Sequence, residues 1–387
     1  MSIVTKKLPT FIDLYSQLIA TPSISSNNPL IDQSNEDIIH LLCEWFEHIG
    51  FKVETTFVNN INNNIKLNML ASIGNGEGGL LLTGHTDTIP ADIEKWTYNP
   101  FILTEKNNKL YGLGSVDMKC FFAFILNAVR NLNPLKLKKP LYILATAEEE
   151  TSMAGAKQFS EYTTIYPDYA IIGEPSCLKP IRAHKGHISK AIHIQGQSAH
   201  SSNPFKGINA IEIVYEIIDY LLKLRNDLRE NYQNNLFNIP YPTINFGYIH
   251  GGHASNCICG YCELHIDIRP TSDITIMEIN NLINNVLTYV NPCWSKRISI
   301  SELHPYIPAY ECSSYHEIVK FLERITGTKA CSVDYCTEAS FIQKICPTLI
   351  IGPGSIEQAH QKDEFLDMVF IKPTHNLIKK LIHYFCY

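Results

Sequence analysis

The sequence predicts an α/β fold in which a mixed sheet flanked by helices is interrupted by an inserted α+β domain. Short, continuous apolar runs alternate with helical stretches through roughly the first half of the chain, a rhythm typical of a sheet covered on both faces. Further along, apolar and polar residues alternate with a period of two, which indicates half-buried antiparallel strands. A last apolar run then resumes the first pattern, so we expect the first domain to be discontinuous.

The buried strands are predicted from apolar runs that end in Gly, Thr or Ala: Gly79–Thr83, Leu141–Ala147, Tyr169–Gly173 and Thr348–Gly352. Between the first two runs, the chain from Thr86 to Gly114 is polar and loop-like. The segment Met118–Arg130 is apolar enough to predict a buried helix.

The inserted domain is predicted from two alternating segments and one amphipathic helix. Ile188, Ile192 and Ile194 alternate with polar residues, as do Leu264, Ile266 and Ile268. Between them, apolar residues from 211 to 222 mark one face of a helix. A chain of 387 residues, 45% hydrophobic, is long enough for two cores. We expect a first domain of residues 1–183 and 305–387, and an inserted domain of residues 184–304.

Charge and hydropathy indicate a small-molecule partner. The 32 basic and 38 acidic residues give a net charge of -6, and no Lys/Arg-rich run offers a nucleic acid a binding surface. The N-terminus lacks the apolar core of a signal peptide, and no stretch of about 18 uncharged apolar residues occurs. We therefore expect no membrane association and a cytoplasmic location.

The twelve cysteines are scattered through a long chain, which favours reduced thiols in the cytosol over a disulfide framework. Cys257, Cys259 and Cys262 resemble part of a zinc site. However, no CxxC pair elsewhere would complete four ligands. We interpret the triplet as small hydrophobic residues of a strand.

Ionisable residues follow the predicted strands. They are His85 and Asp87, Glu148 to Glu150, Glu174 and His360, and Asp117 lies in a loop between strands. Ligands of open α/β sheets bind at the carboxyl ends of the strands. Two imidazoles with several carboxylates suit zinc, cobalt or manganese, and one carboxylate spanning two ions would be the simplest way to hold a pair.

The segment His85-Thr86-Asp87 predicts a particular contact. Residues two apart in an extended segment point to the same side. We therefore expect the Asp87 carboxylate to accept the second N–H of His85 and to fix its tautomer.

Several segments carry a family resemblance: GHTDTIP at 84–90, GLGSVDMK at 112–119, AEEETSMAGA at 147–156, IIGEP at 171–175 and GQSAHSS at 196–202. In this combination they resemble the M20 metallopeptidase family. Further similar segments (AHKGHIS, DIRP, YCTEASF and GPGSIEQAH) extend the resemblance from about residue 10 to the C-terminus.

The resemblance implies two divalent metal ions, Zn²⁺ or Co²⁺, in a catalytic domain. It places His85 and Glu150 at opposite metal positions, which Glu174 and His360 complete, and it places Asp117 between the two ions.

A general base is also implied, in the middle of an Asp-Glu-Glu pattern that maps onto Glu148, Glu149 and Glu150. Because the first residue here is Glu, the register is ambiguous by one position. We favour Glu149 over Glu148 because ETSMAGA follows in the expected frame.

The resemblance further implies that the inserted domain forms a homodimer and acts as a lid. His200 would reach the active site of the partner subunit and stabilise the oxyanion. Arg269, together with Asn256, would bind a substrate carboxylate, and Glu338 is our candidate partner for a substrate ammonium.

The activity implied is hydrolysis of the amide bond of N-acetyl-L-ornithine to L-ornithine and acetate, a step of arginine biosynthesis. Two sibling activities stay open: desuccinylation of N-succinyl-diaminopimelate, and a carboxypeptidase or aminoacylase reaction. A catalytically silent binding protein of the same fold should lack a metal ligand or the base, and none is missing here. A two-metal phosphatase should carry Arg or Lys clusters near the ligand loops, and none is found.

Overall fold

The computed structural model describes residues 8–59, 64–290 and 292–387, which form two compact units. The first unit comprises the described residues up to Arg182 together with Cys312–Cys331 and Thr337–Tyr387. The second comprises Ala183–Glu311 and Ser332–Cys336. The second unit therefore extends beyond the expected residues 184–304 and includes a short return of the chain at 332–336.

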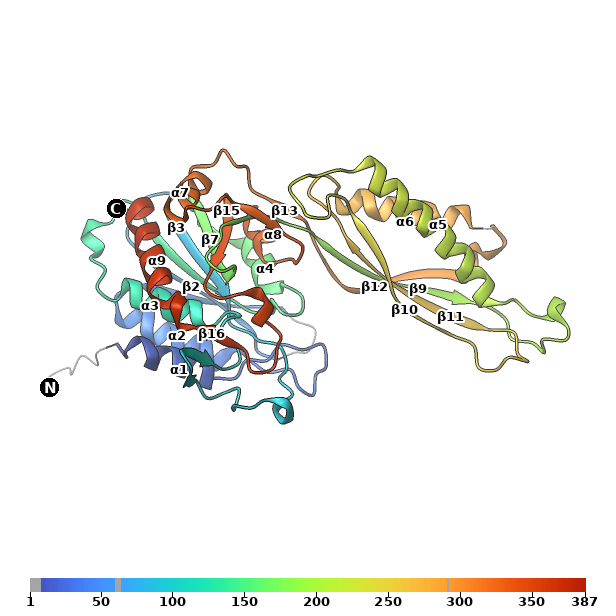
Figure 1. Cartoon of the computed structure of the whole chain (residues 1–387), viewed down its shortest axis with the longest axis horizontal. Coiled ribbons are helices and arrows are strands. Elements are labelled where there is room, and N and C mark those ends of the chain that lie inside the picture. The colour runs from blue at the N-terminus through green and yellow to red at the C-terminus, as the bar shows by residue number, and fades with distance from the viewer. Residues whose placement is uncertain (1–7, 60–63, 291) are drawn as a thin grey trace. The chain divides into compact units, whose positions relative to one another are not determined.

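The first unit contains a mixed sheet, as predicted (Figure 1). Its order is β1 (Lys52–Phe57), β2 (Leu67–Ile73), β6 (Leu141–Thr146), β3 (Leu80–His85), β7 (Tyr169–Pro175), β15 (Thr348–Gly352) and β8 (Ile181–His184). Strands β6, β3, β7 and β15 run parallel to one another, whereas β1, β2 and β8 pair antiparallel with their neighbours. Strand β8 ends in the second unit, where its residues Ala183 and His184 pair with the short strand β13 (Tyr310–Glu311). The short strand β14 (Cys331–Val333) also pairs with β8.

Helices flank this sheet. Helices α1 (Phe11–Ala20) and α9 (Ile371–Cys386) pack against α3 (Cys120–Val129), while α2 (Glu36–His48) packs against β2. Helix α4 (Ala154–Tyr162) contacts β2 and α8 (Ala339–Ile342), and α7 is Glu317–Thr326. The predicted helix at Met118–Arg130 is confirmed as α3, whose apolar side chains are buried.

A small sheet and short turns complete the described secondary structure. The small sheet joins β16 (Phe365–Asp367), β5 (Lys109–Tyr111) and β4 (Thr104–Lys106). The short 3₁₀ helices are Ile93–Lys95, Pro134–Lys136, Pro204–Lys206, Pro292–Arg297, Ile356–Gln358 and Met368–Phe370.

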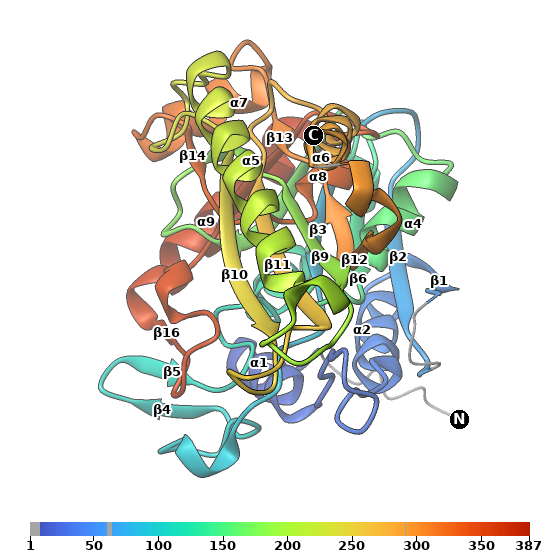
Figure 2. The ribbon, with the colours of Figure 1, turned by 90° about the vertical axis from the view of Figure 1, so that its right-hand side faces the viewer.

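The second unit is a four-stranded antiparallel sheet in the order β10 (Thr243–Gly251), β11 (Tyr261–Arg269), β9 (His187–Gln195) and β12 (Ile298–Ile307). Helix α5 (Ala210–Asn231) lies across β10 and β11, and α6 (Ile276–Tyr289) packs beside it (Figure 2). Ile192, Leu264 and Ile266 point into the core beneath these helices, which confirms the predicted period of two.

The structure also bears on two expectations from the sequence, the lack of membrane-spanning helices and the state of the cysteines. No helix in the described part of the chain is long and apolar enough to cross a membrane. The cysteines are free thiols, and Cys259 and Cys262 pack into the core of the second unit. Their environment fits the interpretation as small hydrophobic residues.

Candidate metal centre

The candidate site lies where the parallel strands of the first unit end. His85 is the last residue of β3, Glu174 lies near the end of β7, and Glu148 to Glu150 follow β6 by one residue. His360 comes eight residues after the end of β15. Because parallel strands direct their carboxyl ends to one edge, these side chains meet there.

Two groups of ligand atoms share Asp117. The first group contains His85, Asp117 and Glu174, and the second contains Asp117, Glu150 and His360. Within each group the ligand atoms lie within 4.8 Å of one another. His85 Nε2 lies 3.0 Å from Asp117 Oδ1 and 3.5 Å from Glu174 Oε1.

The second group uses the other oxygen of the same carboxylate. His360 Nε2 lies 3.0 Å from Glu150 Oε2 and 3.7 Å from Asp117 Oδ2. Asp117 therefore presents one oxygen to each imidazole, the arrangement that a carboxylate spanning two ions requires.

The electrostatics of this cluster fit two divalent cations. Burial raises the pKa of Glu174 well above its usual range, and the charge of Asp117 adds to the rise. Burial likewise raises the pKa of Glu150, again with a contribution from Asp117. Buried carboxylates in contact with one another are unfavourable unless a cation compensates them. With two imidazoles present, this donor set suits Zn²⁺, Co²⁺ or Mn²⁺.

Asp87 makes a different contact from the one that we expected. His85 Nδ1 lies 2.9 Å from the backbone carbonyl oxygen of Asp87, whereas the nearest carboxylate oxygen of Asp87 is 3.7 Å away. The expectation was wrong about the acceptor, because the carbonyl of the same residue lies closer to the ring. An Nδ1–H that donates to this carbonyl leaves the Nε2 lone pair directed at the shared carboxylate, as a metal ligand requires.

The Asp87 carboxylate instead holds the loop after β6. Its Oδ1 accepts the backbone N–H of Glu149 at 3.2 Å, and its Oδ2 accepts that of Glu150 at 3.1 Å. Asp87 is fully buried. The base candidate and a ligand candidate are thus fixed by one carboxylate.

Glu148 and Glu149 occupy different environments. The Glu148 carboxylate forms an ion pair of 2.7 Å with Lys66 and accepts a hydrogen bond from the Thr151 hydroxyl at 2.9 Å. Glu149 belongs to a third group of ligand atoms with His85 and Glu150. Burial raises the pKa of Glu149 well above its usual range; Glu174 and Glu150 add to the rise, and His85 opposes it.

Glu338 is a buried carboxylate beside this cluster, just before α8. It is fully buried, and neither of its oxygens accepts a hydrogen bond of ordinary geometry from the described residues. Burial raises the pKa of Glu338 to about 7, and the charge of His85 opposes the rise. A buried carboxylate without a partner is costly, so the site favours a cationic group there.

The remaining candidates, His200, Asn256 and Arg269, belong to the second unit. His200 is exposed, and its Nδ1 accepts the backbone N–H of Ser202 at 3.2 Å, which leaves the proton on Nε2. Arg269 donates to both carboxylate oxygens of Asp267, at 2.9 and 3.3 Å. Asn256 is exposed, and its carbonyl accepts the N–H of Ser201 at 3.0 Å.

Two residues that the sequence analysis missed support the site. The buried Glu364 accepts backbone N–H groups of Gly114, Val116 and Asp117 at 2.6 to 3.0 Å, and so holds the loop that carries the shared carboxylate. Lys66 holds Glu148. The available signals were a Glu four residues after His360 and a single Lys at the start of an apolar strand.

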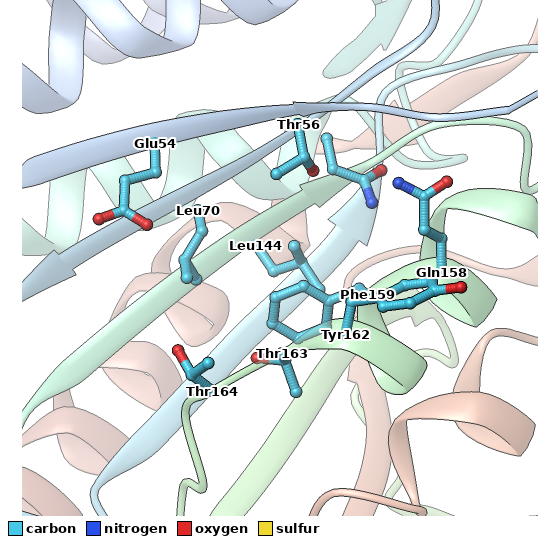
Figure 3. Close-up of a pocket in the computed structure, with 10 residues that line it drawn as sticks. Glu54, Thr56, Leu70, Leu144, Gln158, Phe159, Tyr162, Thr163 and Thr164 are labelled. Atoms are coloured by element: carbon cyan, nitrogen blue, oxygen red, sulfur yellow. The ribbon is translucent and has the colours of Figure 1, made fainter.

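A separate cavity of about 180 Å³ lies between α4 and the strands β1, β2 and β6. The rings of Phe159 and Tyr162 lie beside Leu144 in this cavity (Figure 3). None of the candidate ligands lines it. It is therefore distinct from the metal centre.

Two relatives are similar to this sequence over nearly its full length. The acetylornithine deacetylases of Pectobacterium atrosepticum and Pectobacterium carotovorum subsp. carotovorum are each 60% identical over 380 residues, covering 98% of this chain and 99% of the relative.

Solved structures share the fold at lower identity. An M20 family metallo-carboxypeptidase from Sulfolobus solfataricus is 17% identical, with a TM-score of 0.75 over 97% of this chain and 98% of that one. A dinuclear metal-binding M20 peptidase from Bacillus subtilis is 14% identical, with a TM-score of 0.66 over 97% of each chain. The profile of peptidase family M20/M25/M40 matches residues 81–384, and the chain belongs to this family.

Proposed function

We propose that this protein hydrolyses the amide bond of N-acetyl-L-ornithine, releasing L-ornithine and acetate for arginine biosynthesis in the cytoplasm. The observation that carries the hydrolytic chemistry is the pair of ligand groups joined through Asp117. The identity of 60% with two acetylornithine deacetylases supports the substrate. The resident cofactors are two divalent cations, Zn²⁺ or Co²⁺, a choice that fits the mixed imidazole and carboxylate ligands.

The cations would polarise the amide carbonyl and lower the pKa of a water molecule to near neutrality. Glu149 would take the proton from the attacking water and return it to the leaving amine, the task of a general base that becomes a general acid. Its position among His85 and Glu150 supports this role. Glu148 is less suited, because Lys66 and Thr151 already engage its carboxylate.

The substrate's charged groups would be recognised by three residues. Glu338 would pair with the side-chain ammonium of acetylornithine, since its buried carboxylate lacks a partner. Arg269, whose planar guanidinium suits a carboxylate, would bind the α-carboxylate together with Asn256.

The active form would be a homodimer in which His200 acts on the partner subunit's site. Because Nδ1 of His200 accepts the N–H of Ser202, its Nε2 carries a proton that it could donate to an oxyanion. Its exposed position in the second unit supports a role in contacts beyond its own domain.

Replacing the candidate base should abolish turnover without loss of the bound metal ions. Glu149→Gln should lower kcat on N-acetyl-L-ornithine by about 10²–10⁴-fold, because an amide cannot accept the proton. Metal content, measured by plasma mass spectrometry, should match that of the wild type. Full activity of Glu149→Gln would exclude this residue as the base.

Substrate identity is tested by comparing kcat/KM on N-acetyl-L-ornithine and on N-succinyl-diaminopimelate. We expect the acetyl substrate to be preferred. Faster turnover of the succinyl substrate would overturn the assignment.

Glu338→Gln should reduce kcat/KM on N-acetyl-L-ornithine by more than on N-acetylnorvaline, which lacks the side-chain ammonium.

The partner-subunit role of His200 is tested by mixing two inactive variants, His200→Ala and Glu149→Gln, under conditions that exchange subunits. In a mixed dimer, one site combines an intact Glu149 with the partner's intact histidine. Activity should therefore recover to about a quarter of the wild-type value for statistical exchange in a two-fold dimer. If mixed dimers form, as native mass spectrometry would show, and no activity returns, His200 does not act across subunits.

A further inference from the structure

Lys66 is a buried cation that lies behind the loop after β6. Only 1% of its surface is exposed, and its ammonium has three partners: Glu148 Oε1 at 2.7 Å, Asp32 Oδ1 at 3.0 Å and Ser25 Oγ at 3.0 Å. These partners match the three donors of an ammonium group. Every N–H donor of the Lys66 ammonium group therefore has a partner.

Each partner of Lys66 is itself fixed. Asp32 accepts the backbone N–H of Ser26 at 3.0 Å and the side-chain amide of Asn64 at 2.6 Å. The Ser25 hydroxyl donates to Glu148 Oε1 at 3.2 Å. The cluster forms a rigid connection between the segment after α1 and the loop that carries the base.

The position of Lys66 follows from strand register. In the antiparallel pair β2–β6, Met69 faces Ala145 and Leu70 faces Leu144. Continuing this register beyond the end of the ladder sets Lys66 opposite Glu148. Two residues along, Asn68 accepts the N–H of Ala147 at 3.2 Å and donates to the carbonyl of Gly155 at 2.8 Å. Asn68, near the start of β2, thus contacts both ends of the loop between β6 and α4.

The loop needs such support at Glu148. This residue has φ of +66°, in the left-handed region that residues with a side chain rarely adopt. Its carbonyl accepts the N–H groups of Ser152 and Met153, at 3.0 and 2.6 Å, and so closes a tight turn. The left-handed conformation reverses the chain between β6 and Glu149.

We propose that Lys66 is a positioning residue for catalysis: by binding the Glu148 carboxylate, it holds the left-handed turn that delivers Glu149 to the metal centre. Asp87 in addition fixes the backbone N–H groups of Glu149 and Glu150. Lys66 and Asp87 together hold the loop at two places, the carboxylate of Glu148 and the backbone of Glu149 and Glu150. This inference rests on Glu149 being the base.

Loss of this positioning should appear in kcat rather than in KM. Lys66→Met leaves the Glu148 carboxylate buried without its cation, and the turn relaxes. A shift of about 1 Å in a catalytic group can lower the rate by about 10²-fold. We expect kcat on N-acetyl-L-ornithine to fall about 10- to 100-fold, with KM within about twofold and unchanged metal content.

Variants at Glu148 separate positioning from chemistry. Glu148→Gln keeps an oxygen for Lys66 and should retain most of kcat, whereas Glu148→Ala removes the connection and should lose as much as Lys66→Met. The double variant Lys66→Met/Glu148→Ala should lose no more than either single variant, because both break the same link. If Lys66→Met does not fold, the two Glu148 variants still test the proposal.

A matched control is Lys190→Met. Lys190 is also a buried lysine, 8% exposed, with a carboxylate partner, Glu302, at 3.7 Å in the second unit. It should lose thermal stability and keep its kcat. The proposal is overturned if Lys66→Met keeps the wild-type kcat, if its loss of activity follows loss of metal, or if the effects of Lys66→Met and Glu148→Ala multiply. The base assignment fails separately if Glu149→Gln is active.

Discussion

The sharing of one carboxylate between two imidazoles is the constraint around which the first unit is organised. Asp117 directs Oδ1 toward His85 and Oδ2 toward His360. Two further carboxylates, Glu174 and Glu150, complete the two groups, so negative charge is concentrated in a buried place. Such crowding is stable only with compensating cations. The surrounding residues must therefore hold these carboxylates close together against their mutual repulsion until cations bind.

Buried polar side chains supply that rigidity by holding backbone rather than substrate. Glu364 accepts N–H groups of the loop that carries Asp117, and Asp87 accepts those of Glu149 and Glu150. Asn68 of β2 likewise accepts the backbone N–H of Ala147, and Lys66, just before β2, binds the carboxylate of Glu148. Charge-assisted hydrogen bonds to backbone N–H groups are strong in a site that excludes water. The loops that carry the candidate ligands and the candidate base are thereby fixed by side chains that lie in strands or next to strand ends.

The sequence was sufficient for the fold and for the clustering of the ligand candidates. Parallel strands end at a common edge, so residues such as His85 and Glu174, which lie at strand ends, must meet once the strands are recognised. The alternation around Ile192 and Leu264 likewise required only the geometry of a half-buried strand. Both predictions depend on local sequence patterns, which are visible within a single segment of the chain.

Contacts between distant segments were not predictable in this way. Lys66 meets Glu148 across 82 residues of sequence, and Glu364 meets the Asp117 loop across nearly 250, so neither pair leaves a local signal. The expected acceptor for His85 was also wrong, because spacing indicates which side a residue faces but not whether its carbonyl or its carboxylate lies nearer.

The proposed activity depends on two divalent cations, which the two ligand groups that share Asp117 would hold. The most direct measurement is the number of metal ions bound per chain in fully active protein, determined by plasma mass spectrometry on samples titrated with metal. Two ions per chain at full activity on N-acetyl-L-ornithine is the predicted result. Full activity with one ion or none would contradict it.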